Sequence, residues 1–182
     1  MPLPKLSDAQ VAWVIQQVAV YIERQRRSFV RGAAPLSQNQ RTAMRPFFPE
    51  SSLNSARIVM LRGIRVGAPP IYEELVQMGF EADSLPDIDR VAAVTFVDTI
   101  VSHELFTDRL LFHELVHVVQ YEKLGLADFA AQYVRGFLSG GSYEAIPLER
   151  NAYQLTHRFA AAPMNPFSVN AEVQAWIDAG RF

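Results

Sequence analysis

The segment Leu111–Val119 contains the pattern His-Glu-x-x-His, and all of its remaining positions are apolar. Such a run predicts a helix that is buried on nearly all sides. Residues four apart lie on one face of a helix, so His113 and His117 can direct two imidazoles at one metal ion. Buried imidazoles and carboxylates are costly unless they are paired or bind a metal. The segment therefore restricts the fold to one with a polar centre on a central helix.

Glu114 follows His113 directly and lies about 100° around the helix, at the edge of the site that the two histidines would form. From there it can accept a proton from water activated by the metal without binding the metal itself. This division of roles is typical of zinc hydrolases, so we expect Zn²⁺ as the cofactor and Glu114 as the catalytic base. The alternative is a metal-free core helix in which the two histidines are simply hydrogen-bonded.

The third metal ligand must be a carboxylate or one of the other two histidines, His103 and His157. The chain has no cysteine, which excludes a thiolate ligand. The long metzincin signature is also excluded, because its later glycine and histidine positions are occupied here by Gln120 and Lys123.

Glu149 is the strongest candidate for that ligand. Pro147 suits the first turn of a helix, and Glu149 would lie just inside its start. One face of this helix then carries Glu149, Ala152, Tyr153, Thr156 and His157. Glu144 and His157 stay open as alternatives, and Glu149 could instead only stabilise the helix N-terminus. A reaction at this centre also needs a donor for a developing oxyanion, for which Tyr143, Tyr153 and His157 are the candidates.

The metal helix, followed by the pattern Tyr-Glu-x-x-Pro-Leu-Glu-x-x-Ala-Tyr at residues 143–153, resembles the gluzincin branch of the zincin metallopeptidases. It is most similar to small bacterial metallopeptidase domains, over residues 88–160. The resemblance implies that His113, His117 and Glu149 bind zinc and that Glu114 is the base. One position departs from the pattern, because Tyr153 stands where larger gluzincins have an aspartate that supports a histidine.

We expect an α+β fold, mostly helical, with a small twisted sheet packed on the metal helix, as in zincins. The chain would form a single domain over residues 1–182, with an N-terminal helical part (1–50) and a catalytic core (88–160). Apolar spacing and turn residues predict helices near 8–30, 37–44, 71–78, 126–138 and 170–179, besides the two of the motif. Strands are predicted near 56–61 and as a hairpin within 88–101.

A net charge of −2 and a pI near 6.1 argue against nucleic acid as a partner. No apolar run approaches the length of a membrane span, and the first residues lack the apolar core of a secretory signal. The default location is therefore cytoplasmic, with non-classical secretion as an alternative. We expect a peptide or protein substrate; the sequence carries no signal of oligomeric state. A zinc-binding interaction or regulatory module with little activity is the alternative function.

Overall fold

The structure is a computed structural model that describes residues 3–88 and 90–182. Its α-helices are α1 (Asp8–Phe29), α2 (Gln38–Met44), α3 (Glu50–Ser55), α4 (Ile71–Gln77), α5 (Asp108–Gly140), α6 (Pro147–Ala161) and α7 (Val169–Asp178). Its strands are β1 (Ala34–Pro35), β2 (Arg57–Met60), β3 (Ala93–Phe96) and β4 (Thr99–Ser102). Short 3-10 turns lie at Val30–Gly32, Ala82–Ser84 and Tyr143–Ala145. The fold is thus α+β and mostly helical, as expected.

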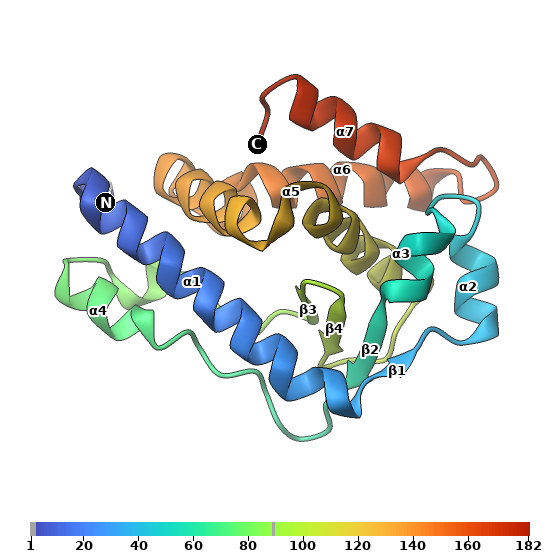
Figure 1. Ribbon diagram of the computed structural model, residues 1–182, viewed down its shortest axis with the longest axis horizontal. Helices are drawn as coiled ribbons and strands as arrows, with labels where there is room; N and C mark the ends of the chain where they lie inside the picture. The colour runs from blue at the N-terminus through green and yellow to red at the C-terminus, as the bar shows by residue number, and fades with distance from the viewer. Residues whose placement is uncertain (1–2, 89) are drawn as a thin grey trace.

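The four strands form one mixed sheet in the order β1-β2-β4-β3. Strand β2 runs parallel to β4, whereas β1 pairs with β2 and β3 with β4 in antiparallel fashion. The hairpin predicted within 88–101 is confirmed, and it places β3 at an edge of the sheet. Helix α5 contacts β3 on one side and packs along α6 on the other, with α7 beyond them (Figure 1).

Helix α1 begins at a capping box. The backbone N–H of Ser7 donates to the side-chain oxygen of Gln10, and the backbone N–H of Gln10 donates to the hydroxyl oxygen of Ser7. Helix α2 begins in the same way at Ser37 and Gln40. Both helix starts agree with the sequence. Helix α3 and strand β1 were not predicted, because six and two residues are too few for a periodic pattern.

Helix α5 bends at Gly125, whose backbone has φ 75° and ψ 166°. This conformation is accessible in practice only to glycine, so a residue with a side chain would be strained there. The bend confirms the separate helix predicted from residue 126 onward. The second half of α5 therefore runs in a different direction from the first.

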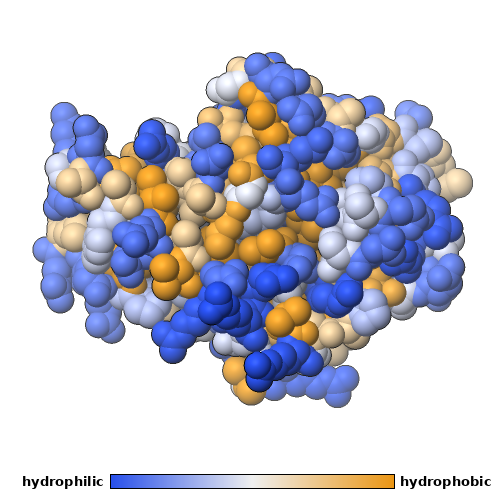
Figure 2. Space-filling model, in the orientation of Figure 1, coloured by the Kyte–Doolittle hydropathy of each residue, from blue (hydrophilic) through white to orange (hydrophobic). Residues whose placement is uncertain are grey.

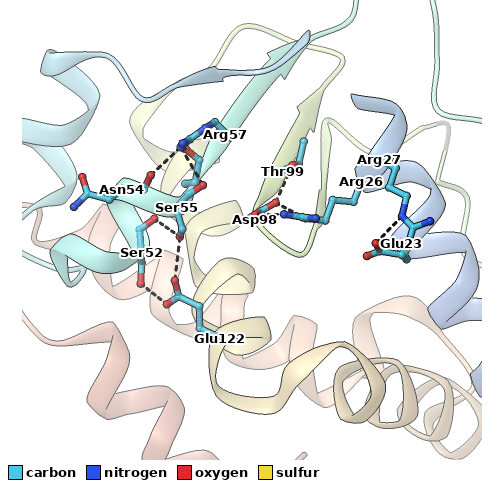
Figure 3. Close-up of polar contacts among 11 residues, drawn as sticks. Glu23, Arg26, Arg27, Ser52, Asn54, Ser55, Arg57, Asp98, Thr99 and Glu122 are labelled. Carbon is cyan, nitrogen blue, oxygen red and sulfur yellow. Dashed lines mark hydrogen bonds and ion pairs between the residues drawn. The ribbon is translucent and has the colours of Figure 1, made fainter. Parts of the chain in front are cut away.

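The β3–β4 hairpin is tied to α1 through Arg26, which donates two hydrogen bonds to the carboxylate of Asp98 at 2.8 and 2.6 Å (Figure 3). The side chain of Thr99 donates a third to the same carboxylate. The turn itself is strained, because Val97 has φ 62°, a left-handed conformation that β-branched residues rarely adopt. These contacts hold the edge strand against the N-terminal helix.

Two further interactions anchor α5 on the opposite side of the sheet. Ser52 and Ser55 of α3 donate hydrogen bonds to Glu122 (Figure 3). Next to them lies an aromatic cluster in which Phe112 stacks on Phe159, with ring centroids 4.4 Å apart. These contacts fix the first half of α5, which carries His113 and His117, against α3 and α6.

Candidate metal centre

Three side chains from α5 and α6 converge in the interior of the protein. Nε2 of His113 lies 3.6 Å, and Nε2 of His117 lies 3.4 Å, from Oε2 of Glu149. The two histidine nitrogens are 3.3 Å apart. All three residues are buried, and one ligand atom from each falls within 4.8 Å of the others. The structure thus brings together the three ligands that the sequence predicted, in an arrangement that could hold a metal ion.

Close packing of α6 on α5 brings Glu149 to this position. Gly136 of α5 faces the start of α6, where a Cβ atom would lie 2.5 Å from Cδ of Pro147. Only glycine therefore allows the two helices to approach so closely at this point. Pro147 occupies the first position of α6, as predicted, and Glu149 follows within the first turn.

Gln120 determines which nitrogen of His117 carries the proton. Its side-chain nitrogen donates to the carbonyl of Leu148 at 3.0 Å and to Oδ1 of Asn151 at 2.9 Å. Both N–H groups are then used, so the amide oxygen must face Nδ1 of His117, 2.9 Å away. An amide oxygen only accepts, so Nδ1 is the protonated nitrogen. The lone pair of neutral His117 is therefore on Nε2, directed at the cluster.

Thr156 has the same effect on His113. Its hydroxyl donates to the carbonyl of Ala152 at 2.7 Å and lies 3.3 Å from Nδ1 of His113. Because its hydrogen is engaged, the oxygen can only accept, and Nδ1 of His113 carries the proton. Both imidazoles thus present a lone pair on Nε2, the state in which histidine binds metals.

The centre therefore consists of three electron-pair donors that face one another. Oε2 of Glu149 is buried and has no hydrogen-bond donor among the described residues. Two imidazole lone pairs and a carboxylate oxygen repel one another unless a cation lies between them. Two histidines and a glutamate form a donor set suited to zinc, so these residues fit the metal that the sequence implies.

Without a metal, a proton would have to take the cation's place. Burial by itself lowers the pKa of His117, but the adjacent Glu149 carboxylate more than reverses this and raises it to about 9. Burial likewise raises the pKa of Glu149, yet the neighbouring histidines shift it far below its usual range. A proton shared by the two side chains thus substitutes for the cation.

Glu114 lies beside this cluster and is held by the edge strand. The hydroxyl of Thr95 donates to Oε2 of Glu114 at 2.7 Å. Glu114 also lines the same cavity as His117 and Glu149. The hydroxyl of Thr95 therefore fixes one oxygen of this carboxylate at the edge of the cavity.

Of the three candidates for an oxyanion donor, Tyr143 and Tyr153 lie next to the centre and His157 does not. Tyr143 lines the cavity, and the ring of Tyr153 lies 4.6 Å from that of His113. Burial, reinforced by the charge of Glu149, raises the pKa of both tyrosines, so their hydroxyls stay protonated. His157 is exposed on α6 and lies outside the group of three ligands. Tyr133, which the sequence reasoning passed over, also lines the cavity.

The alternative ligands Glu144 and His103, and the acidic residues Glu122 and Asp128 that follow the motif, are placed elsewhere. Glu144 and Asp128 are exposed, and Glu122 pairs with the serines of α3. His103 is structural: its two ring nitrogens face the carbonyl of Val91 at 2.8 Å and the amide of Val66 at 3.2 Å. The group of potential metal ligands in the described part of the chain is thus His113, His117 and Glu149.

None of the helices in the described ranges is both long and apolar enough to span a membrane. Comparison of the chain with protein-family models, with curated proteins and with solved structures finds no match.

Proposed function

We propose that this protein is a zinc-dependent hydrolase of peptide bonds, with the ligand arrangement of a gluzincin-type zincin. The observation that carries the proposal is the convergence of three lone pairs from His113, His117 and Glu149, with the tautomer of each histidine set by a hydrogen bond. In the metal-free protein a proton shared by His117 and Glu149 holds these groups together, and a metal ion would displace it. The substrate class that suits this chemistry is a peptide or protein.

The side chains around the centre would divide the work of hydrolysis. A bound zinc ion would supply a Lewis acid that polarises a carbonyl and makes water more acidic. Glu114, oriented by Thr95, would take a proton from the attacking water and later deliver it to the departing amine nitrogen. The protonated hydroxyl of Tyr143 or Tyr153 would donate to the oxygen on which negative charge develops.

A second function, a zinc-holding module with little or no turnover, is favoured by the depth of the centre. The exposed fractions of His113, His117 and Glu149 are 8%, 6% and 3%, and that of Glu114 is 4%. A substrate would have to reach these groups through the adjoining cavity. The two functions share every ligand and differ only in whether a peptide is cleaved.

Zinc content and cleavage of a broad peptide library, measured on the same preparation, test the proposal. We expect one zinc per chain and cleavage by the parent protein. Glu114→Gln should retain the zinc and lower kcat/KM about 10²- to 10⁴-fold, because only the proton acceptor is lost. Glu149→Gln should lose zinc and activity together.

The matched control is Glu144→Gln, an exposed glutamate five positions before the ligand, which should leave both measurements unchanged. Absence of zinc in the parent, or equal activity in Glu114→Gln, would contradict the proposed enzyme. Zinc without any cleavage would support the module.

A further inference from the structure

The C-terminal half of α1 carries a basic groove on its outer face. Four of the eight residues from 24 to 31 are arginines, and none is acidic. Three of these arginines, Arg24, Arg27 and Arg31, lie about one turn apart and line the groove. Val20 of the same helix and Leu126 of α5 line it with them. Figure 2 shows strongly hydrophilic atoms, with a few hydrophobic ones among them, over the lower middle of the molecule, where this half of α1 lies in Figure 1.

Much of the positive charge in the basic groove is not neutralised within the chain. Arg27 donates to Glu23, one turn earlier on α1, at 2.8 Å. Arg24 and Arg31 are exposed, and neither forms an ion pair with any residue that the structure describes. Val20, beside them, is 56% exposed. The groove therefore offers unpaired cations next to hydrocarbon that nothing in the chain covers.

Negative charge is gathered on a different segment, residues 66–88, which we call the acidic lobe. It contains five acidic residues and neither lysine nor arginine. Four of the five are exposed and form no ion pair with a described residue: Glu73, Glu74, Glu81 and Asp83. Val76 of α4 lies among them and is 44% exposed. The acidic lobe thus has the same composition as the basic groove with the charge reversed, namely unpaired charges around an exposed valine.

The acidic lobe is held away from the groove of its own chain. Ile71 and Leu75 bury the inner face of α4, and the hydroxyl of Tyr72 donates to the carbonyl of Pro86 at 2.9 Å. Helix α4 lies beside the N-terminal half of α1, whereas the groove belongs to the C-terminal half (Figure 1). The two complementary surfaces can therefore meet only when they belong to different molecules.

We propose that the basic groove of one copy of this protein binds the acidic lobe of a second copy, with Val20 of one against Val76 of the other. Opposite charges would steer the two surfaces together, and the paired valines would lose their exposure to water. Because the two surfaces differ, each contact leaves a free groove on one copy and a free lobe on the other. Such head-to-tail contacts produce a ring or a chain of copies. The proposal is independent of the metal centre.

A second copy suits the groove better than a nucleic acid or an anionic membrane does. Glu23 adds a negative charge to the lining, and the whole chain has a net charge of −2, so an extended polyanion would meet repulsion around the groove. Phosphate groups would also leave Val20 and Leu126 without an apolar partner. The acidic lobe provides both the carboxylates and the hydrocarbon.

The unaltered protein tests the association by sedimentation equilibrium. At about 10 mM ionic strength, where charges act over about 30 Å, the mean mass should rise with concentration above the 20.5 kDa of one chain. At about 1 M, where they act over about 3 Å, the mass should return toward that of one chain. A single chain at every concentration, or an association that ignores salt, would overturn the proposal. So would a single chain that instead sediments with phosphatidylserine vesicles.

A charge exchange identifies the two surfaces. Arg24→Glu with Arg31→Glu reverses the groove, and Glu73→Lys with Glu74→Lys reverses the lobe. Each double variant alone should associate at least about tenfold more weakly than the parent, because like charges then face each other. An equimolar mixture of the two should recover the concentration-dependent mass, because each reversed surface meets its opposite. Two folded variants that stay apart in the mixture would contradict the pairing.

The matched control is Arg62→Glu with Arg135→Glu, which changes the net charge equally at exposed arginines outside both surfaces. It should associate like the parent. An equal loss in the control and in the groove variant would attribute the effect to net charge and overturn the assignment of the groove. The salt dependence of the parent needs no variant, so the association remains falsifiable even if a variant does not fold.

Discussion

The amide oxygen of Gln120 accepts a hydrogen bond from Nδ1 of His117 across 2.9 Å, one turn along the same helix. Gln120 is itself held from α6, through Leu148 and Asn151. The orientation of the His117 imidazole on α5 is therefore set by the helix that supplies Glu149. Two predictions follow from contacts of this kind.

Replacing Gln120 by leucine should weaken zinc binding about 10- to 100-fold, because His117 loses the acceptor that fixes its tautomer and ring orientation. Competition with a chromophoric chelator measures the affinity. Unfolding by urea should be measured in parallel, since the variant also leaves the buried acceptors on Leu148 and Asn151 unpaired. An unchanged affinity in a folded variant would show that Gln120 does not position the histidine.

Thr156 offers a cleaner comparison, because valine matches its shape and serine keeps its hydroxyl. Thr156→Val should lower zinc affinity about tenfold, since Nδ1 of His113 loses its acceptor. Thr156→Ser should remain within a factor of about two or three of the parent, because the accepting oxygen is retained. Equal losses in both variants would attribute the effect to packing and contradict the assigned role.

Zinc binding should release close to one proton at pH 7.5, because the pKa of His117 in the metal-free protein is raised to about 9. The raised pKa also sets a stability window. The protonated histidine stabilises the metal-free fold fully below the ordinary pKa of 6.5, and this contribution is lost as the pH rises through about 9. Calorimetry in buffers of different ionisation enthalpy measures the released protons as the slope of the observed binding enthalpy against that ionisation enthalpy. A slope of zero would contradict the shared proton.

The capping box at Ser7, the His-Glu-x-x-His helix and the start of α6 could be predicted because their signals are local. Ser7 with Gln10, His113 with His117, and Pro147 with Glu149 are each separated by four residues or fewer. The contact of Gln120 with His117 has the same local spacing and could have been predicted too.

Other parts of the centre depend on tertiary packing and leave no local pattern. Thr95 lies 19 positions before Glu114, and Thr156 lies 43 positions after His113. The contribution of α1 to the cavity is equally remote, since Val14 lies 100 positions before Glu114 in the chain. Neither periodicity nor a motif records contacts of this kind.

The ion pair between Arg26 and Asp98 should make the free energy of unfolding fall at low pH. Burial raises the pKa of Asp98, but the hydrogen bonds from Arg26 and Thr99 hold it below its ordinary value. The pair therefore stabilises the fold above about pH 4, and this contribution is lost as the pH falls through the lowered pKa. Asp98→Asn should cost about 1 kcal/mol at pH 7, and the difference from the parent should shrink on acidification.

Urea unfolding at several pH values measures this difference. Glu23→Gln is the matched control, because its partner Arg27 is exposed and the two are one turn apart on α1 (Figure 3). The control should cost less than about 0.5 kcal/mol. An Asp98→Asn difference that stayed constant down to pH 2 would contradict the role of the ion pair.

Phe112 is fully buried, stacks on Phe159 and meets the rings of Phe47 and Phe48 edge to face. Phe112→Ala should lower the free energy of unfolding by about 3 to 5 kcal/mol, because it removes a large apolar side chain and leaves a cavity. Phe112→Leu should cost about 1.5 kcal/mol, since most of the volume is kept. A loss below about 1 kcal/mol for the alanine variant would show that the cluster collapses around the gap.

The bend at Gly125 makes one continuous segment responsible for two tasks. Before it, α5 carries His113 and His117; after it, α5 carries Phe129 and Tyr133, which face the same cavity as His117. An apolar guest in that cavity would therefore contact both halves of α5 at once. By thermodynamic reciprocity, whatever an apolar guest does to the affinity for zinc, zinc must do in equal measure to the affinity for that guest.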